Sequence, residues 1–413
     1  MWRAKRLYDV GGVLLPRPFK LRRLGHFGLN VASIADSLRL YRNLLGFKVS
    51  DVLDFGGVPH LAEIVAGLAE TSGVFMRYGT DHHAFVLFPK DLMARRGERA
   101  PARQDNTINQ ITWQCGSLRE VVEAAAYFEE RGVPVLRAGR DMPGSNWHVY
   151  LEDPDGHVNE LYYGMEQIGW NGLCKPLPMY DRKFDAAPPL PQPSEEAEVV
   201  AARAKGVDLA AGRPPEFNED GSYDVEGVLL PRPFKITKIG PVNLFVEDVA
   251  ASLRFYRDIL GFVFTEEATC HGRRCLFLRN GTEHHALALL PRELRADLGL
   301  GPQTSCMAFG LEVGSYRQLR EAVRFLRQRG LRLMEGMPAE LHPGIDYAAY
   351  VQDPDGHCLM LYFCMEQLGW DGTPRPPELR RRLTARAAFD DWPETLPAQP
   401  DTYVDQVFQG PLG

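Results

Sequence analysis

The chain has 413 residues, a formal net charge of −7 at pH 7 and no block of basic residues, which argues against a nucleic acid or an anionic membrane as the main partner. Its seven cysteines form no C-x-x-C pair and no even set, so neither a disulfide scaffold nor a structural zinc site is indicated. No apolar stretch approaches the length needed to span a bilayer, and we expect a protein of the reducing cytoplasm.

The first elements follow one another in a regular order. A strand at residues 27–31 precedes a helix at 35–45, and strands follow at 47–53, 73–78 and 84–88. The same order restarts with a strand at 111–115, a helix at 118–131, and strands at 133–136, 147–151 and 158–163. This part of the chain is therefore expected to contain two β-α-β-β-β modules.

The rest of the chain repeats this part. Residues 12–20 recur unchanged at 227–235, residues 82–84 at 284–286, and residues 153–157 at 353–357. Such repetition indicates a duplicated domain. We expect a first domain over 13–172, a Pro-rich linker over 173–226, a second domain over 227–372 and a C-terminal tail over 373–413. The predicted fold is α+β, with four modules paired into two tandem domains whose cupped, mostly antiparallel sheets each enclose a pocket.

Two repeated motifs have structural explanations. The Pro-Arg-Pro-Phe-Lys segment lies just ahead of the first strand in both domains, and we expect it to pack as an arm that ties modules together. His157 and His357 lie in Asp-Pro-Asp-Gly turns and are expected to face solvent.

Three polar residues of the first domain have no polar counterpart in the second. His26 opens the first strand of one module, Gln110 stands at the matching place in the next, and Glu160 lies on the final strand. The second domain has Pro241, Ala308 and Met360 at these positions, so the fold itself does not need the polar side chains. Two donors at strand starts and one carboxylate could converge on one face of an octahedral ion. We predict a metal site in the first domain and a degenerate second domain without a metal.

The modules and two motifs resemble the vicinal oxygen chelate superfamily, which includes extradiol ring-cleavage dioxygenases, glyoxalase I and fosfomycin/bleomycin resistance proteins. The motifs are LYRNLLGF at residues 40–47 and DPDGHVNEL at 153–161. The resemblance covers both repeats. It is nearest to the type I extradiol dioxygenases, which are similar in having four modules in one chain.

The resemblance implies roles for further residues. The second histidine of the family's His-His strand entry acts as acid and base, and this residue is His83 here. The family's active-site tyrosine falls on Tyr150, and His148 on the same strand face is a candidate substrate contact. The dioxygenases bind Fe(II) through two His and one Glu. Because Gln110 would offer an oxygen donor in place of the second His, we expect Fe(II), with Mn(II) as the alternative.

The implied activity is that of an extradiol-type dioxygenase, which cleaves a catechol-like or hydroquinone-like ring with O2. Its partners would be a small aromatic substrate and O2, and a homo-oligomer is compatible with the sequence. Two alternatives stay open: a glyoxalase- or epimerase-like enzyme that stabilises an enediolate, and a protein that binds an aromatic compound without turnover. The fourth metal donor of glyoxalase I, a Glu, would fall near Phe85 or Val86, which favours oxygen chemistry.

Overall fold

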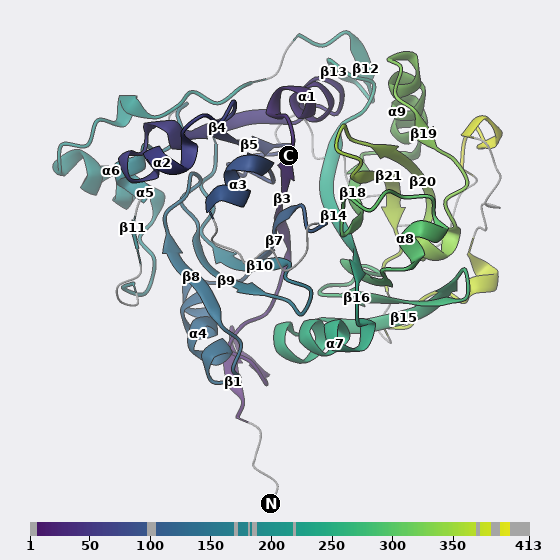
Figure 1. The fold of residues 1–413 in the computed structure, drawn as a ribbon, viewed down its shortest axis with the longest axis horizontal. Helices are drawn as coiled ribbons and strands as arrows, with labels where there is room; N and C mark the ends of the chain where they lie inside the picture. The colour runs from purple at the N-terminus through teal and green to yellow at the C-terminus, as the bar shows by residue number, and fades with distance from the viewer. Residues whose placement is uncertain are drawn as a thin grey trace, which may run out of the picture.

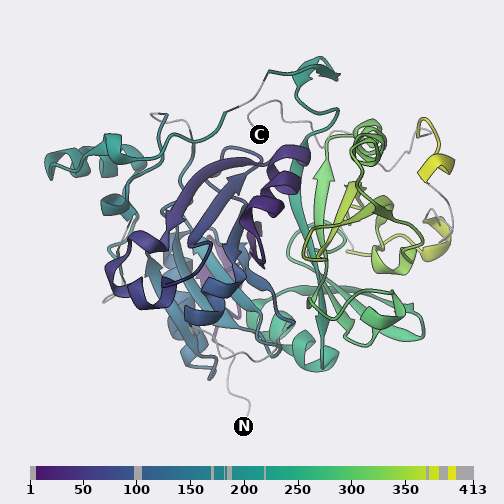
Figure 2. The ribbon, with the colours of Figure 1, turned by 45° about the horizontal axis from the view of Figure 1, so that its top comes forward.

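The computed structural model describes residues 6–96, 105–168, 172–180, 188–217, 220–368, 372–380 and 389–396, together with the backbone of 182–183. The two repeats lie side by side, the first in purple to blue and the second in green (Figure 1). The turned view in Figure 2 shows the same two halves, with the connecting segment at the outer edge of the first.

Both modules of the first repeat have the predicted order of elements. The first module contains β3 (Arg23–Val31), α1 (Ile34–Leu38) extended by a π-helical turn (Arg39–Leu44), β4 (Lys48–Asp54), β5 (Ser72–Arg77) and β6 (Phe85–Pro89). The second contains β7 (Ile108–Gln114), α4 (Leu118–Glu129), β8 (Val135–Arg140), β9 (Trp147–Glu152) and β10 (Val158–Tyr163). Two short helices, α2 (Ala62–Val65) and α3 (Lys90–Arg96), are added to the first module.

The second repeat has the same order. Its first module contains β14 (Ile236–Val246), α7 (Val249–Arg254) with a π-helical turn (Phe255–Leu260), β15 (Val263–Cys270), β16 (Arg273–Arg279) and β17 (Leu287–Pro291). Its second module contains β18 (Cys306–Val313), α9 (Tyr316–Gln328), β19 (Leu333–Met334), β20 (Ile345–Gln352) and β21 (Cys358–Met365), and α8 (Leu294–Asp297) joins the modules. A small hairpin precedes each repeat, formed by β1 (Tyr8–Val10) with β2 (Val13–Leu15) and by β12 (Tyr223–Val225) with β13 (Val228–Leu230).

Each repeat builds one open mixed sheet. The order in the first is β11-β8-β9-β10-β7-β3-β6-β5-β4, where β11 (Arg182–Lys183) comes from the segment after the repeat. The order in the second is β15-β16-β17-β14-β18-β21-β20-β19. In the first sheet β3 runs parallel to β6 and β10 parallel to β7, whereas the other neighbours are antiparallel. The predicted α+β fold of four modules in two tandem domains is confirmed.

The long helix of each repeat shows how local sequence sets these elements. Ser117 precedes α4, and its hydroxyl accepts the Glu120 backbone N–H, which satisfies one of the unpaired amides at a helix start. The buried residues Val121, Ala124 and Phe128 then recur at helical spacing and face the sheet. Ser315 caps α9 through the backbone N–H of Gln318 in the same way.

The two repeats share one apolar core and a reciprocal set of hydrogen bonds. The rings of Phe27 and Phe309 stack with centroids 4.4 Å apart across the boundary between the repeats. Tyr41 donates its hydroxyl to Asp353 of the other repeat at 2.9 Å, and Tyr256 donates to Asp153 at 2.9 Å. The boundary is therefore a packed interface in which each repeat donates a tyrosine hydroxyl to the Asp-Pro-Asp-Gly turn of the other.

The prediction that His157 and His357 face solvent is wrong, because both side chains are buried in this interface. His157 lies with Nδ1 2.9 Å from Asp153 Oδ2 and Nε2 2.8 Å from Ser305 Oγ of the second repeat. His357 makes the matching contact, with Nε2 2.5 Å from Thr107 Oγ1. Each Asp-Pro-Asp-Gly segment does form a turn, but the other repeat packs over it and excludes solvent.

Part of the Pro-rich segment between the repeats is folded against the first repeat. It contains α5 (Leu177–Tyr180) and α6 (Glu195–Ala204), and Arg140 of β8 forms a bidentate ion pair with Glu198 of α6 at 2.5 and 2.7 Å. Cys174 and Lys175 at its start are buried. Among the described residues, no helix has both the length and the apolar character needed to cross a membrane.

Candidate active site

Glu160 is the centre of the candidate site. It lies in the middle of β10, opposite Thr112 of β7 on one side and Tyr150 of β9 on the other, and its side chain is fully buried. Thr112 donates its hydroxyl to Oε2 at 2.8 Å, and Asn146 donates its amide to Oε1 at 2.7 Å. A carboxylate held in this way has a single orientation.

The other two predicted metal donors point at this carboxylate. His26 Nε2 lies 3.0 Å from Glu160 Oε2, and the Gln110 amide donates to the same oxygen at 3.1 Å. Both side chains are buried, and they come from β3 and β7, the two central strands of the sheet. The structure thus brings His26, Gln110 and Glu160 together in one buried group.

The carboxylate is held in its ionised form. Burial raises the pKa of Glu160, but the charge and hydrogen bond of His26, together with His148 and Thr112, outweigh burial and lower it to about 2. The opposite ring nitrogen of His26, Nδ1, is buried without a hydrogen-bond partner. A buried ionised carboxylate requires a positive charge nearby.

His83 adjoins this group. Its ring centroid lies 4.4 Å from that of His26, and its Nδ1 lies 3.0 Å from Nδ1 of His82. Burial lowers the pKa of His83 well below its ordinary value, and the nearby His26 and His82 lower it further, so the imidazole is neutral. Gly144 packs directly on this ring with φ +96°, and a Cβ there would lie 2.8 Å from His83 Nδ1.

Tyr150 and His148 stand on the strand next to Glu160. Burial, followed by the charge of Glu160, raises the pKa of Tyr150 well above 10, so the phenol keeps its proton. His148 lies between two carboxylates, with Nδ1 3.8 Å from Glu160 and Nε2 3.2 Å from Asp141, and neither nitrogen is aligned for a hydrogen bond. All six predicted site residues therefore lie around one point of the first sheet.

Sequence reasoning missed Thr112 and Asn146, the two residues that orient the carboxylate. Thr112 could have been found, because it lies two positions after Gln110 on a strand and must share its face. Asn146 stands in the turn ahead of β9, where no periodicity links it to Glu160. Its place follows from tertiary structure alone.

The second repeat presents a different interior at the matching place. Ala308 and Met360 belong to an apolar cluster of fully buried side chains. Tyr350, which corresponds to Tyr150, donates its hydroxyl to the Met360 sulfur at 3.2 Å and lies 3.0 Å from His342 Nδ1. The position of Glu160 is thus taken by a thioether with little affinity for a hard ion.

The residues of the first site fit a divalent ion of intermediate hardness. They offer one imidazole, one ionised carboxylate and one carboxamide, whose Nε2 contacts Glu160 and whose oxygen would be presented to an ion by a half-turn of the amide group. A bound cation would also neutralise the buried charge of Glu160. His26, Gln110 and Glu160 are the residues that would hold it.

The match to a family model covers residues 23–161 and 238–361, and the family is described as the glyoxalase/bleomycin resistance protein/dioxygenase superfamily. The chain belongs to this superfamily. Both matched regions coincide with the repeats, so the duplication is one of complete family domains. A search of curated proteins finds no match.

Solved structures of the superfamily share the fold over nearly the whole chain. A catechol 2,3-dioxygenase has a TM-score of 0.51 at 19% identity, covering 88% of this chain and 93% of its own. The Mn(II)-bound glyoxalase from Novosphingobium aromaticivorans has a TM-score of 0.55 at 16% identity, and the match covers 93% of this chain and 98% of the glyoxalase. Homoprotocatechuate 2,3-dioxygenase from Arthrobacter globiformis has a TM-score of 0.54 at 17% identity, and the match covers 90% of each chain. At these identities the likeness establishes the fold alone, and the reaction has to be inferred from the residues of the candidate site.

Proposed function

We propose that this protein is a metal-dependent dioxygenase of the extradiol type, which opens the ring of a catechol-like or hydroquinone-like aromatic compound with O2. The observation that carries the proposal is the convergence of His26 and Gln110 on the ionised carboxylate of Glu160. His83 adjoins His26 and Tyr150 adjoins Glu160, and a substrate's hydroxyl groups would be placed between them.

The ion is proposed to be Fe(II), with Mn(II) as the alternative, since an imidazole and two oxygen donors suit both. When bound, it would supply Lewis acidity toward the substrate's hydroxyl groups and a redox centre for O2. The chain's own residues would do the rest. His83 is neutral and can take a proton from a substrate hydroxyl, and Tyr150 keeps its proton and can donate a hydrogen bond that orients the substrate. His148 is proposed as a further substrate contact.

An aromatic substrate is supported by the surroundings of His83. Phe75 lies edge-on to the His83 ring with centroids 5.1 Å apart. It belongs to an apolar cluster with Phe55, Val86, Phe88 and Leu92, over which α2 and α3 pack. These apolar side chains lie beside the polar site, which suits an aromatic ring that directs a hydroxyl group at the site.

A metal-dependent isomerase of the glyoxalase kind is the second candidate, because a Mn(II)-bound glyoxalase shares the fold over 93% of this chain. Against it, the place expected for a fourth acidic donor holds Phe85 and Val86, both buried among apolar side chains. Oxygen consumption separates the two reactions, since an enediolate isomerisation uses no O2.

The experiment measures bound metal and O2 uptake of the purified full chain against a panel of catechols and hydroquinones. We expect stoichiometric Fe or Mn, and ring-opened product formed with equimolar O2. Glu160→Ala should lose this metal, and unchanged Fe or Mn content in that variant would overturn the site.

The duplicated histidine pair supplies a matched control. His83→Gln should lower kcat by about 100-fold or more, as expected for loss of a general acid or base. His285→Gln changes the corresponding residue of the second repeat and should keep full activity. Equal losses in both variants would show that the histidine pair serves the fold and not the reaction.

A further inference from the structure

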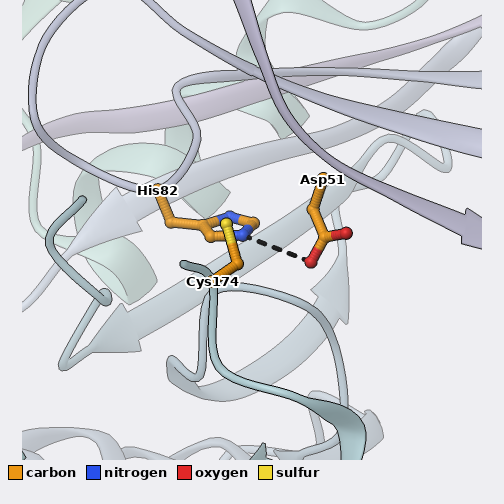
Figure 3. Close-up of side chains that lie close together, drawn as sticks. All are labelled: Asp51, His82 and Cys174. Carbon is orange, nitrogen blue, oxygen red and sulfur yellow. Dashed lines mark ion pairs between the residues drawn. The ribbon is translucent and has the colours of Figure 1, made fainter. Parts of the chain in front are cut away.

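A second group of metal-ligating side chains lies behind His83. Asp51 from β4, His82 from the turn after β5, and Cys174 from the segment after the first repeat each direct one donor atom to a common point (Figure 3). These atoms lie within 4.8 Å of one another, and His82 Nε2 is 3.6 Å from Asp51 Oδ2. We refer to them as the Asp51–His82–Cys174 cluster.

The imidazole in this cluster has an unused nitrogen. His82 is fully buried, and its Nε2 has no hydrogen-bond partner, although Nδ1 is engaged with His83. A buried ring nitrogen without a partner loses its hydration and gains no contact in return, so its presence calls for a ligand. The nitrogen faces the Asp51 carboxylate, as Figure 3 shows, and the Cys174 sulfur lies within 4.8 Å of both donor atoms.

The surroundings contain buried acidic groups, together with Arg77 and Arg213 near Cys174 and Lys175 near Glu166. Glu166 is fully buried nearby, with one carboxylate oxygen that has no hydrogen-bond partner. Burial raises the pKa of Glu166, and burial with the charges of Glu166 and Asp51 raises the pKa of the Cys174 thiol far above its usual range. Within the described part of the chain, no lysine or arginine forms an ion pair with Asp51. A bound cation would give the Asp51 carboxylate a direct positive partner.

The second repeat shows how the chain fills the same place when the cysteine is absent. Glu266 and His284 correspond to Asp51 and His82, with His284 Nε2 3.2 Å from Glu266 Oε2, and Pro374 corresponds to Cys174. Here the guanidinium of Arg380 forms a bidentate ion pair with Glu266, 2.6 and 2.5 Å long. The position corresponding to Arg380 in the first repeat is Tyr180, a residue without positive charge.

We propose that the Asp51–His82–Cys174 cluster binds a divalent transition-metal ion, with Zn²⁺ preferred, separate from the His26–Gln110–Glu160 site. One imidazole nitrogen, one thiolate and one carboxylate form a tetrahedral N/S/O set of the kind that selects zinc, and Glu166 or a water completes it. Binding forms a metal–sulfur bond and releases the thiol proton to solvent. The local sequence spacing did not indicate this site because its donors come from three distant segments.

Such an ion would position His83. With Nε2 of His82 bound to the metal, its proton must lie on Nδ1, so His82 donates to Nδ1 of His83. The proton of neutral His83 is then on Nε2. The second ion would thus set the tautomer of the histidine that the proposed function uses as acid and base. The metal site itself does not depend on the proposed function.

The test uses the purified full chain, stripped of metal and reloaded with Co²⁺ as a spectroscopic substitute for Zn²⁺. We expect a thiolate-to-cobalt charge-transfer band that is lost in Cys174→Ser. The band should survive in Cys364→Ser, which changes a half-buried cysteine of the second repeat. It should also survive in Glu160→Ala, since that variant empties only the first site. A wild-type chain without the band, or a Cys174→Ser chain that keeps it, overturns the proposal.

A measurement on the wild-type chain covers the case in which Cys174→Ser does not fold. X-ray absorption at the zinc edge of the zinc-loaded protein should show one sulfur at about 2.3 Å. A coordination shell with nitrogen and oxygen alone would refute the site. If the sulfur is seen while O2 uptake fails, only the proposed dioxygenase activity is wrong.

Discussion

His26 Nε2 and Glu160 Oε2 lie 3.0 Å apart, although 134 positions separate the two residues in the chain. The contact joins the first strand of one module to the last strand of the next. The corresponding residues of the second repeat, Pro241 and Met360, can form no such contact because neither has a hydrogen-bond donor or a charge. This pair, together with Gln110 and its counterpart Ala308, distinguishes the candidate site of the first repeat from the matching place in the second.

Gln110→His tests whether the carboxamide sets the choice of metal. Imidazole is a softer donor than an amide oxygen, so the variant should keep a metal site but bind Zn²⁺ and Co²⁺ more tightly relative to Mn²⁺. We expect the ratio of the two affinities to change by about tenfold or more, measured by competition between Mn²⁺ and Zn²⁺. Ala308→His, at the matching place of the second repeat, is the control. An unchanged ratio in Gln110→His would mean that residue 110 does not ligate.

Gly144→Ala tests the position of His83. The new Cβ would lie 2.8 Å from His83 Nδ1, so the ring must move and kcat should fall by at least about tenfold. Gly132 is the matched control, since it also has a positive φ, +69°, but open space around its Cβ position. Both variants should lose about 1 kcal/mol of stability from the strained backbone, measured by urea unfolding. A Gly132→Ala enzyme as slow as Gly144→Ala would contradict the role of the His83 contact.

His342→Met tests a pH dependence of stability. Burial lowers the pKa of His342 from 6.5 to about 4, so between these pH values the unfolded chain binds a proton that the folded chain does not. Stability should therefore fall as pH is lowered through this window, by up to about 3 kcal/mol from this group. The variant carries the residue found at the matching position, Met142, and should lack this component. Urea unfolding between pH 4 and 6.5 gives the free energy of unfolding of both chains. If it falls equally with pH in the two chains, His342 is not the group responsible.

Tyr41→Phe and Tyr256→Phe test the interface between the repeats. Each removes a phenol that donates to a buried carboxylate of the other repeat at 2.9 Å. We expect each to lower the free energy of unfolding by about 1.5–3 kcal/mol, the range for hydrogen bonds to charged groups. Tyr223→Phe, a half-buried tyrosine of the β12–β13 hairpin, should change it by less than about 0.5 kcal/mol. If both interface variants lose less than about 0.5 kcal/mol, the two tyrosine–aspartate hydrogen bonds do not stabilise the interface.

Much of the fold could be read from the repeat and from hydrophobic periodicity. The strand at 158–163 was predicted with the bounds that the structure has, and the helix at 118–131 ends two residues earlier, at Glu129. The helix at 35–45 is less regular than predicted, because it passes from α1 into a π-helical turn at Arg39. Periodicity reports the buried face of such a segment and not the winding of its backbone.

The amino-acid sequence alone was enough for the four modules and for the contrast between His26, Gln110 and Glu160 and their apolar counterparts, because both are patterns along the chain. Tertiary structure determined which distant segments pack against each strand and turn. It buried His157 under the second repeat and brought Asn146 to Glu160. It also assembled the Asp51–His82–Cys174 cluster from segments up to 123 positions apart. Contacts between distant segments depend on how the sheets and repeats pack in space, and no local spacing in the sequence encodes them.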